Sequence, residues 1–310
     1  MKYGFGVDIG GTTIKIGLFS KDGELIEKWE IPTNKTDNGK HILTEIADFI
    51  DRTIESKDID KNDVFGVGLG VPGPVNKNGE VNGCVNLGWN TFNVEKEFNE
   101  ISGFNVKVGN DANVAALGEM WQGAGKGYQD VLMVTLGTGV GGGCVLDGKI
   151  ISGMHGAGGE IGHMPVRDDE PTACNCGNHG CLEQYVSATG IVTQAKKTLE
   201  RDTRSSSLRD YSSLEAKNIY DEAKNGDEVA NEIVDLTCNI LAKSLAQVCC
   251  VMDPEIIVIG GGVSKAGDIL TSRISTFFKE YAFHACENIP VVLAKLENDA
   301  GMYGCVKSLF

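Results

Sequence analysis

The sequence contains two short apolar segments that each end in a glycine turn. They are Val7-Asp8-Ile9-Gly10-Gly11-Thr12-Thr13 and Thr135-Leu136-Gly137-Thr138-Gly139-Val140. In each segment a strand pattern leads into small residues, whose backbone amides can face a chain of phosphates. The two segments form a weak internal repeat, with one phosphate-type loop in each half of the chain. The sequence therefore predicts two halves with a cleft between them.

Short apolar strands alternate with helical patterns around these loops, which favours an α/β architecture. In the first half we expect strands at residues 3–9, 14–20, 24–30, 64–71 and 106–109, and helices at 41–56 and 112–121. In the second half we expect strands at 131–136, 142–146, 256–260 and 290–296, and helices at 188–200, 214–224, 227–252 and 299–309. We predict a small α/β domain at residues 1–111 plus 299–310 and a large α/β domain at 112–298.

The composition supports this organisation and excludes several classes of protein. A chain of 310 residues is about twice the usual length of one domain. Its 28 basic and 43 acidic residues give a net charge of −15, which argues against nucleic acid and anionic membrane as partners. No leader precedes the first strand pattern, so we expect a cytoplasmic protein whose ten cysteines are reduced or bound to metal.

Two stretches match the bare dinucleotide pattern G-x-G-x-x-G, at Gly68/Gly70/Gly73 and Gly137/Gly139/Gly142. A dinucleotide site needs a helix directly after these glycines. Pro72 and Pro74 interrupt the first stretch, and a strand pattern follows the second. An NAD-dependent oxidoreductase is therefore not favoured, and no Walker-type G-x-x-x-x-G-K-[ST] sequence occurs.

The first glycine turn carries groups that suit a nucleotide. Gly10 and Gly11 offer amides, Thr12 and Thr13 offer hydroxyls, and Lys15 offers a cation. Asp8 could hold Mg²⁺ through water. The alternative is an ordinary β-hairpin turn. That alternative weakens because similar glycine turns occur at Gly137-Thr138-Gly139 and, after another strand pattern, at Gly261-Gly262.

A cysteine cluster predicts a metal site. Cys174, Cys176 and Cys181 lie within eight residues, and His163 precedes them. Three thiolates and one imidazole make a closed tetrahedral set that suits structural zinc. The C-x-C spacing is not the usual finger spacing, so three free thiols remain an alternative, and His179 is a rival imidazole.

Asp111 stands at a strand-to-helix junction, where two interpretations are open. Aspartate is a good N-cap, so the residue could simply begin the helix. A carboxylate at this junction could instead belong to a functional site. Glu160 and Glu183 also have two interpretations. Most glutamates are solvated surface charges, so each could be either a surface residue or part of a functional site.

The order of the motifs resembles that of the ROK family of sugar kinases and repressors. The segments that carry the resemblance are DIGGTTIK, VPGPV, VNLGW, NDANVAALGE, LGTGVGGG, GAGGEIGH, CNCGNHGCLE and IGGGVS. They run through essentially the whole chain, and within the family they are most similar to the glucokinases of Gram-positive-type bacteria. The resemblance implies the actin-like ATPase (ribonuclease-H-like) fold, with two domains of mixed sheets around a central nucleotide cleft.

The resemblance also implies an activity, ATP-dependent phosphorylation of glucose at its 6-hydroxyl, with Asp111 as the catalytic base. It assigns the sugar to Gly73, Asn86, Asn110, Asp111, Glu160, His163 and Glu183. It assigns ATP to Gly10, Gly11, Thr12, Thr13, Lys15, Gly137, Thr138, Gly139, Gly261 and Gly262, with Mg²⁺ near Asp8. It points to His163, Cys174, Cys176 and Cys181 as ligands of a structural zinc.

Several alternatives and consequences accompany this assignment. Mannose, fructose or N-acetylmannosamine could replace glucose. A sugar-sensing repressor would need a DNA-binding domain ahead of Asp8, where only seven residues stand.

We expect a homo-oligomer, either a dimer or a tetramer. Because the nucleotide loops are far from the cysteines in sequence, we also expect metal loss to weaken sugar binding while nucleotide binding stays nearly intact.

Overall fold

The computed structural model describes residues 2–310, and internal contacts group the chain into two units. The first unit contains the chain through Gln129 together with Gly143–Gly159 and Lys295–Phe310; the second contains Asp130–Gly142 and Glu160–Ala294. The domain limits expected from the sequence, 1–111 plus 299–310 and 112–298, stay a prediction. Grouping by contacts differs from them by placing residues 112–129, 143–159 and 295–298 with the first unit.

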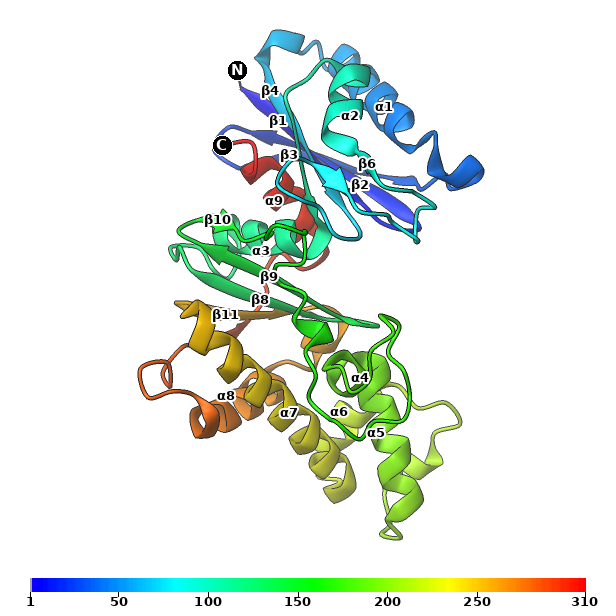
Figure 1. Cartoon of the computed structure of the whole chain (residues 1–310), viewed down its shortest axis with the longest axis vertical. Coiled ribbons are helices and arrows are strands. Elements are labelled where there is room, and N and C mark those ends of the chain that lie inside the picture. The colour runs from blue at the N-terminus through cyan, green and yellow to red at the C-terminus, as the bar shows by residue number, and fades with distance from the viewer. Residues whose placement is uncertain (1) are drawn as a thin grey trace. The chain divides into compact units, whose positions relative to one another are not determined.

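The first unit is built on a five-stranded mixed sheet with the order β3-β2-β1-β4-β7 (Figure 1). β1 and β2 are antiparallel, as are β2 and β3, whereas β4 runs parallel to both β1 and β7. The bounds of these strands are β1 Tyr3–Ile9, β2 Thr13–Ser20, β3 Leu25–Pro32, β4 Val64–Val71 and β7 Val106–Asn110. A separate two-stranded pair is formed by β5 Glu80–Val81 and β6 Phe92–Asn93.

Alternation along β1 gives the two faces of this sheet different partners. Phe5, Val7 and Ile9 are fully or almost fully buried in the main core of the first unit, which they share with α1 (Ile42–Ser56) and α2 (Val94–Ser102). Gly6, which lies between Phe5 and Val7, faces α9 (Ala300–Lys307) instead: a Cβ on Gly6 would collide with the Met302 carbonyl. Gly68 of β4 meets the Cys305 carbonyl in the same way. These glycines therefore let the helix backbone approach the sheet.

The second sheet has the order β10-β9-β8-β11-β12. β8, β11 and β12 are parallel neighbours, while β10 pairs antiparallel with β9. The bounds of the strands are β8 Val131–Leu136, β9 Val140–Leu146, β10 Lys149–Ile150, β11 Ile256–Gly260 and β12 Val291–Leu293. The parallel strands β8 and β11 therefore end beside each other, where the predicted glycine turns begin.

The remaining helices complete the two units. They are α3 Asp111–Gln122, α4 Glu183–Val186, α5 Ala188–Arg201, α6 Ala216–Lys224, α7 Glu228–Met252 and α8 Asp268–Tyr281. Short 3-10 helices occur at Thr36–Gly39, Lys61–Asp63, Ile161–His163, Ser207–Asp210, Gly262–Ala266 and Glu297–Asp299. Within the described residues, α7 alone is long and apolar enough to cross a membrane, and 56% of its most apolar window is buried inside the protein. Burial in the core accounts for that composition.

The α/β class and the mixed sheets predicted from the sequence are confirmed, with differences at particular elements. The sequence analysis missed α2, which Asn93 caps by accepting a hydrogen bond from the Lys96 amide. The strand expected at residues 290–296 ends at Leu293. It ends early because the amides of Lys295 and Leu296 bind the fully buried carboxylate of Glu119.

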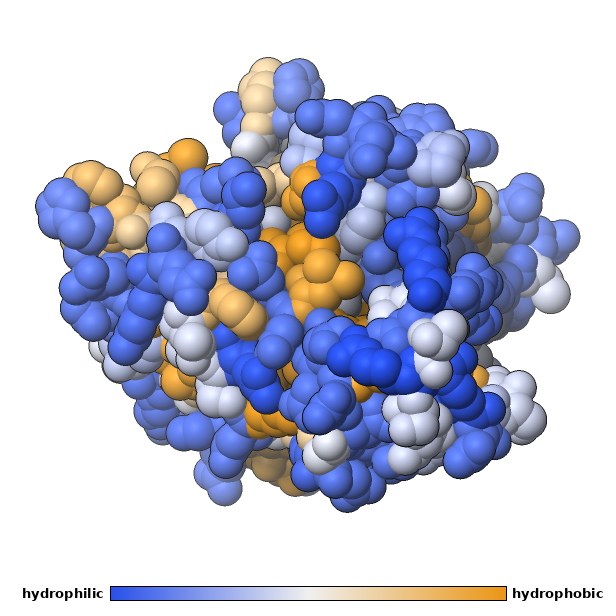
Figure 2. Space-filling model, turned by 90° about the horizontal axis from the view of Figure 1, so that it is seen from below, coloured by the Kyte–Doolittle hydropathy of each residue, from blue (hydrophilic) through white to orange (hydrophobic). Residues whose placement is uncertain are grey.

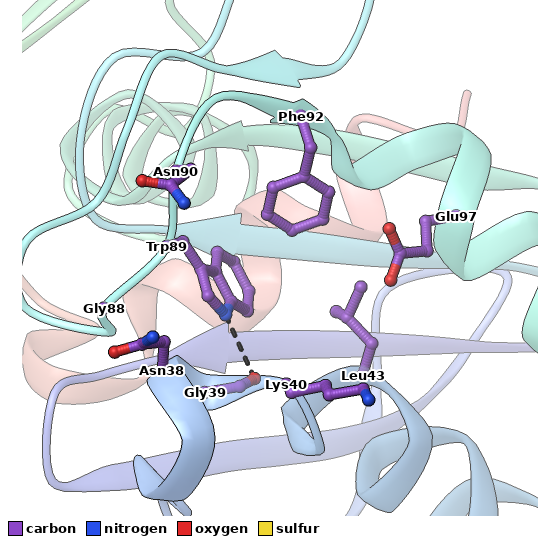
Figure 3. A pocket seen from close by; sticks show the side chains of 9 residues that line it. All are labelled: Asn38, Gly39, Lys40, Leu43, Gly88, Trp89, Asn90, Phe92 and Glu97. Carbon is purple, nitrogen blue, oxygen red and sulfur yellow. Dashed lines mark hydrogen bonds between the residues drawn. The ribbon is translucent and has the colours of Figure 1, made fainter.

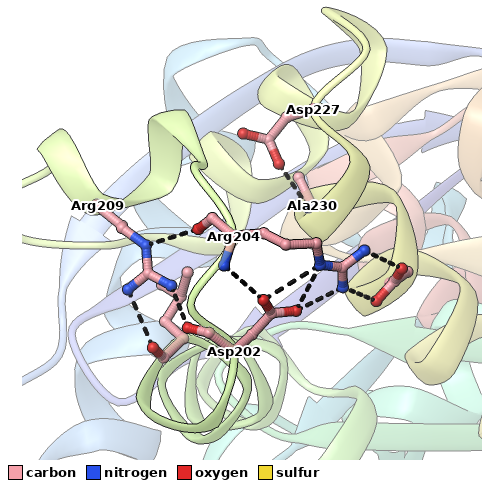
Figure 4. Close-up of polar contacts among 7 residues, drawn as sticks. Asp202, Arg204, Arg209, Asp227 and Ala230 are labelled. Carbon is pink, nitrogen blue, oxygen red and sulfur yellow. Dashed lines mark hydrogen bonds and ion pairs between the residues drawn. The ribbon is translucent and has the colours of Figure 1, made fainter.

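The face of the molecule in Figure 2 is covered mostly by hydrophilic residues, with smaller apolar areas among them. The segment between α5 and α6 is fixed by an ionic network (Figure 4), in which the Arg204 guanidinium contacts Asp202 and Glu232 at 2.5 and 2.6 Å. Arg204 lowers the pKa of Asp202 to about 2. Because these groups are exposed, they order the segment more than they stabilise the fold.

Candidate active site

Asn110, the last residue of β7, organises the start of α3. It is 8% exposed, and its Oδ1 accepts a hydrogen bond from the Asn113 amide at 3.1 Å, so Asn110 is the N-cap of the helix. Its Nδ2 donates to the Gly73 carbonyl at 3.1 Å. The interpretation of Asp111 as the N-cap is therefore wrong. Two residues assigned to the sugar, Asn110 and Gly73, lie in contact.

Asp111 and Asp8 form a pair of neighbouring carboxylates within the first unit. Loss of hydration raises the pKa of Asp8 to about 6, and the charge of Asp111 adds to the rise, while Lys15 opposes it. Desolvation also raises the pKa of Asp111, although the Ala112 amide donates a hydrogen bond to its Oδ1 at 2.8 Å. The structure thus brings the residue predicted to act as base beside the residue predicted to hold Mg²⁺.

The first glycine turn lies beside this carboxylate pair. The Gly10 amide donates to the Thr13 carbonyl at 3.0 Å, and Thr33 Oγ1 donates to the Gly10 carbonyl at 2.7 Å. Thr12 and Thr13 are exposed. A Cβ on Gly11 would lie 3.8 Å from Cβ of Asn86, so this predicted sugar residue adjoins the turn. The backbone of the turn is therefore that of a β-hairpin, and the same turn carries the predicted phosphate-binding groups.

Lys15 is directed toward the C-terminal segment of the first unit. Its Nζ donates to the Asn298 carbonyl at 2.8 Å. The neighbouring contact between Lys28 Nζ and Asp299, at 2.6 Å, fastens the same segment to β3. Both lysines therefore tie residues 298–299 to the first sheet, and the role of Lys15 toward phosphate stays a prediction.

A cavity of about 230 Å³ lies in the first unit (Figure 3). Its lining residues are Asn38, Gly39, Lys40, Leu43, Gly88, Trp89, Asn90, Phe92 and Glu97. The indole N–H of Trp89 donates to the Gly39 carbonyl at 3.1 Å, and the ring is buried. Trp89 is thus a core residue, and none of the predicted site residues lines this cavity.

The four predicted zinc ligands converge in the second unit. The ligand atoms of His163, Cys174, Cys176 and Cys181 all lie within 4.8 Å of one another. Cys174 Sγ is 3.8 Å from Nδ1 of His163, and Cys176 Sγ is 3.6 Å from Cys181 Sγ. Zn–S bonds of about 2.3 Å at tetrahedral angles would put sulfurs about 3.8 Å apart. The quartet therefore fits a zinc ion.

The rival histidine lies outside this group. Nδ1 of His179 is 3.0 Å from the Glu170 carbonyl.

Burial raises the pKa of the Cys181 thiol to about 12. A bound cation would reverse that effect by favouring the thiolates.

Glu160 and Glu183 both lie beside the cysteine–histidine quartet. Glu160 Oε2 is 3.9 Å from Nε2 of His163, the ring nitrogen that points away from Cys174. Glu183 Oε1 is 3.6 Å from Cys174 Sγ, and its Oε2 accepts a hydrogen bond from the Val140 amide at 3.0 Å. The structure therefore joins the acidic residues predicted to bind sugar to the predicted metal site.

The two glycine turns of the second unit are neighbours. The Gly137 amide donates to the Gly139 carbonyl at 2.9 Å. Gly261 has a φ of +83°, and a Cβ there would lie 2.5 Å from the Leu136 carbonyl oxygen. Both turns follow the carboxyl ends of the parallel strands β8 and β11, the position where open α/β sheets bind ligands.

The sequence analysis missed two residues that hold the Gly137 turn. The Ala188 amide donates to the Gly137 carbonyl at 2.8 Å, and Thr189 Oγ1 donates to the Thr138 carbonyl at 2.5 Å. They stand at the start of α5, in a segment whose sequence shows only an ordinary helix beginning. The arrangement is visible only in three dimensions.

These features define a sugar kinase-like protein of the actin-like ATPase fold, and the chain belongs to the ROK family: the family profile matches residues 4–308. The glucokinase of Halalkalibacterium halodurans is 44% identical, over 96% of this chain and 92% of that protein. The glucokinase of Thermotoga maritima is 37% identical, over 96% of this chain and 94% of that one.

Among solved structures, the chain is similar to a ROK family glucokinase from Streptomyces griseus in complex with glucose and AMPPNP. The TM-score is 0.75 at 31% identity, over 99% of this chain and 98% of that chain. The predicted family and fold class are confirmed.

Proposed function

We propose that this protein is an ATP-dependent glucokinase that makes glucose 6-phosphate. The observation that carries the proposal is the pair of desolvated carboxylates, Asp8 and Asp111, beside the Gly10–Thr13 turn. A general base and a site for a phosphate-bound cation are what phosphoryl transfer to a hydroxyl requires. The similarity to glucokinases supports glucose as the substrate.

In this proposal Asp111 accepts the proton of the 6-hydroxyl. The 6-oxygen forms a bond to the γ-phosphorus, the bond from that phosphorus to the β,γ-bridging oxygen breaks, and ADP leaves. The raised pKa of Asp111 makes its carboxylate a better proton acceptor than an ordinary aspartate. The Ala112 hydrogen bond fixes one carboxylate oxygen, so the other can face the sugar.

The remaining predicted site residues have binding roles. Asp8 would hold Mg²⁺ through water, and the cation would neutralise the phosphates while they react. The phosphate oxygens would be bound by backbone amides and side-chain hydroxyls. The amides are those of Gly10, Gly11, Gly137 and Gly139, and the hydroxyls are those of Thr12, Thr13 and Thr138. Lys15 would lie near the phosphates, and Gly261 and Gly262 would lie beside the nucleoside. The sugar hydroxyls would meet Gly73, Asn86, Asn110, Glu160, His163 and Glu183.

A zinc ion on His163, Cys174, Cys176 and Cys181 would act structurally in this enzyme. Nδ1 of His163 faces the cysteines, so Nε2 remains on the side of Glu160. Fixing one ring nitrogen orients the other toward its partner. We further propose that the protein is cytoplasmic and forms a dimer or a tetramer.

A coupled assay over a panel of hexoses tests the function. Purified protein with Mg²⁺ and ATP should release ADP fastest with glucose, and much more slowly with mannose, fructose or N-acetylmannosamine at equal concentrations. A preference for one of those three sugars would replace glucose in the proposal. ADP release that no sugar stimulates would contradict a sugar kinase altogether.

A further inference from the structure

The segment that follows the last predicted zinc ligand packs directly on the Gly137–Val140 turn. Three groups make the contact: the Glu183 carboxylate binds the Val140 amide, the Ala188 amide binds the Gly137 carbonyl, and Thr189 binds the Thr138 carbonyl. All of them lie within eight residues of Cys181. The turn and the cysteine cluster, which are distant in sequence, are therefore one continuous structure within the second unit.

Glu183 makes the closest link because its carboxylate contacts both sides. Oε2 lies 3.0 Å from the Val140 nitrogen, and Oε1 lies 3.6 Å from Cys174 Sγ. A side chain on Gly139 would collide with this carboxylate, so the glycine gives Glu183 its access to the turn. The backbone of Glu183 follows Cys181 by two residues, and the Gln184 amide bonds back to the Cys181 carbonyl at 3.0 Å.

We propose that Glu183 is a positioning residue that couples the His163–Cys174–Cys176–Cys181 quartet to the nucleotide turn. The quartet, when it holds a metal, fixes Cys181, and through the two-residue connection from Cys181 it fixes the place of the Glu183 carboxylate. That carboxylate holds the Val140 amide and with it the shape of the turn. Residues around metal ligands commonly transmit a site's order in this way. The inference rests on the proposed function only in taking the occupant of the turn to be a nucleotide.

These contacts change the expectation drawn from sequence distance. If the turn depended on nothing near the cysteines, metal loss would weaken sugar binding alone. Since Glu183 and the start of α5 hold the turn, metal loss should also weaken nucleotide binding. A hydrogen bond to a charged group is worth enough to change affinity about tenfold or more.

The test compares wild type with Glu183→Ala and Glu183→Gln, and uses Glu170→Gln as the matched control. Glu170 is a largely buried carboxylate of the same unit, and its partners are the Tyr185 hydroxyl, the Thr172 amide and Lys197. Hydrogen exchange of the peptide containing residues 137–140, zinc content, and calorimetric affinities for AMPPNP and for glucose are measured for each protein.

Glu183→Ala should keep its zinc, exchange the Val140 amide at least about tenfold faster, and bind AMPPNP about tenfold more weakly. Glu183→Gln should recover part of both effects, because its carbonyl can still accept from Val140. Glu170→Gln should match wild type. Removing zinc from wild type with a chelator should speed exchange of the same peptide.

Unchanged exchange at residues 137–140 in Glu183→Ala, with glucose affinity alone reduced, would overturn the coupling and leave Glu183 as a sugar ligand. If wild type binds no AMPPNP, the proposed function fails instead. The exchange rates of the alanine variant and of the zinc-free protein still decide the coupling in that case.

Discussion

At the scale of single residues, Asp111 shows how one side chain is freed for chemistry. Asn110 caps the start of α3, and its side chain also donates a hydrogen bond to the Gly73 carbonyl. Asp111, one position into the helix, can therefore direct its carboxylate elsewhere. Its neighbour Asp8 carries a second charge that the protein desolvates at a cost in stability. Such costs are typical of functional sites.

Substitution Asp111→Asn should lower kcat by about 10²–10⁴, because the amide cannot accept the proton of the hydroxyl. The fold and the affinity for glucose should persist, since the Asn110 cap is untouched. Steady-state kinetics and calorimetric glucose binding check both points. A kcat within a few-fold of wild type would remove Asp111 from the role of base.

Substitution Asp8→Asn should stabilise the ligand-free protein at neutral pH. The pKa of Asp8 rises from 3.8 to about 6 on folding, so the folded state binds more protons between these values. Stability from this group is fully present below pH 3.8 and is lost as the pH rises through about 6. The asparagine variant avoids that loss. At pH 7.5 its Tm should be about 2–4 °C higher, the shift expected for roughly 1 kcal/mol in a protein of this size.

The difference in Tm between the Asp8→Asn variant and wild type should disappear near pH 4. The kinase activity of the variant should be lower than that of wild type. Thermal melts at both pH values measure this, with Asp48→Asn, an exposed carboxylate of α1, as the control that should not shift. A variant less stable than wild type at pH 7.5 would show that the Asp8 charge is favourably solvated or paired in the fold.

At the scale of elements, the glycines of β4 explain why a stretch matches the dinucleotide pattern without a helix after it. Gly68 and Gly70 belong to the pattern G-x-G-x-x-G, yet they lie inside a strand. Gly68 faces the Cys305 carbonyl, and Gly70 lies near the Cys305 sulfur and Asp8. Their small size serves the packing of α9 on the sheet, which agrees with the exclusion of a dinucleotide site.

Substitution Gly68→Ala should therefore destabilise the protein strongly. The added methyl group would collide with the Cys305 backbone, which cannot move without shifting α9. Overpacking of a core usually costs about 1–3 kcal/mol, or several degrees in Tm. Gly262→Ala adds a methyl group into open space and is the thermal control. Equal melting temperatures of the two variants would contradict close packing of α9.

The segment that carries the predicted zinc ligands is a second element that can be tested directly. Elemental analysis of the purified protein should give about one zinc per chain. Cys176→Ala should lose that metal and, by loosening Cys174 and Cys181, reduce the affinity for both glucose and nucleotide. Cys250→Ala, which removes an exposed cysteine outside the quartet, is the control and should keep the metal. A metal-free preparation with normal glucose and nucleotide affinity would leave the quartet as free thiols.

Sequence patterns predicted the apolar strands closely and the polar helices less well. The bounds of β1, β4, β8 and β11 agree with the expected ones because continuous apolar runs mark buried strands. The sequence did not predict α2 because only Val94, Phe98 and Ser102 are buried along it, so its apolar pattern is weak. Its capping residues, Asn93 and Gly103, were the available signal.

The residues of the cysteine–histidine quartet were predictable from the sequence, whereas contacts between distant elements were not. The motifs pointed to His163, Cys174, Cys176 and Cys181 as zinc ligands, and the structure places these four side chains together. The neighbourhood of Asp8 and Asp111, and the bond from Glu183 to Val140, depend on sheet topology and on loop packing. Nothing in local sequence encodes such long-range pairings.

At the scale of the whole molecule, the charge of −15 opposes the binding of ATP. Local groups must therefore overcome the field of the protein as a whole. In the proposed function, the glycine turns supply oriented amides for this purpose, and Asp8 supplies a place for the cation. The first unit carries such a turn after β1, and the second carries one after β8 and another after β11. The turns after β1 and β8 are the two of the internal repeat in the sequence.

The central claim is that this molecule moves the γ-phosphoryl group of ATP to the 6-hydroxyl of glucose. Its most direct test is NMR analysis of the products formed from ¹³C-labelled glucose, ATP and Mg²⁺ by the purified protein. Glucose 6-phosphate and ADP should form in equal amounts, and product formation should be slowed by orders of magnitude in Asp111→Asn. Phosphate on another carbon, or ADP and free phosphate with unaltered glucose, would contradict this transfer.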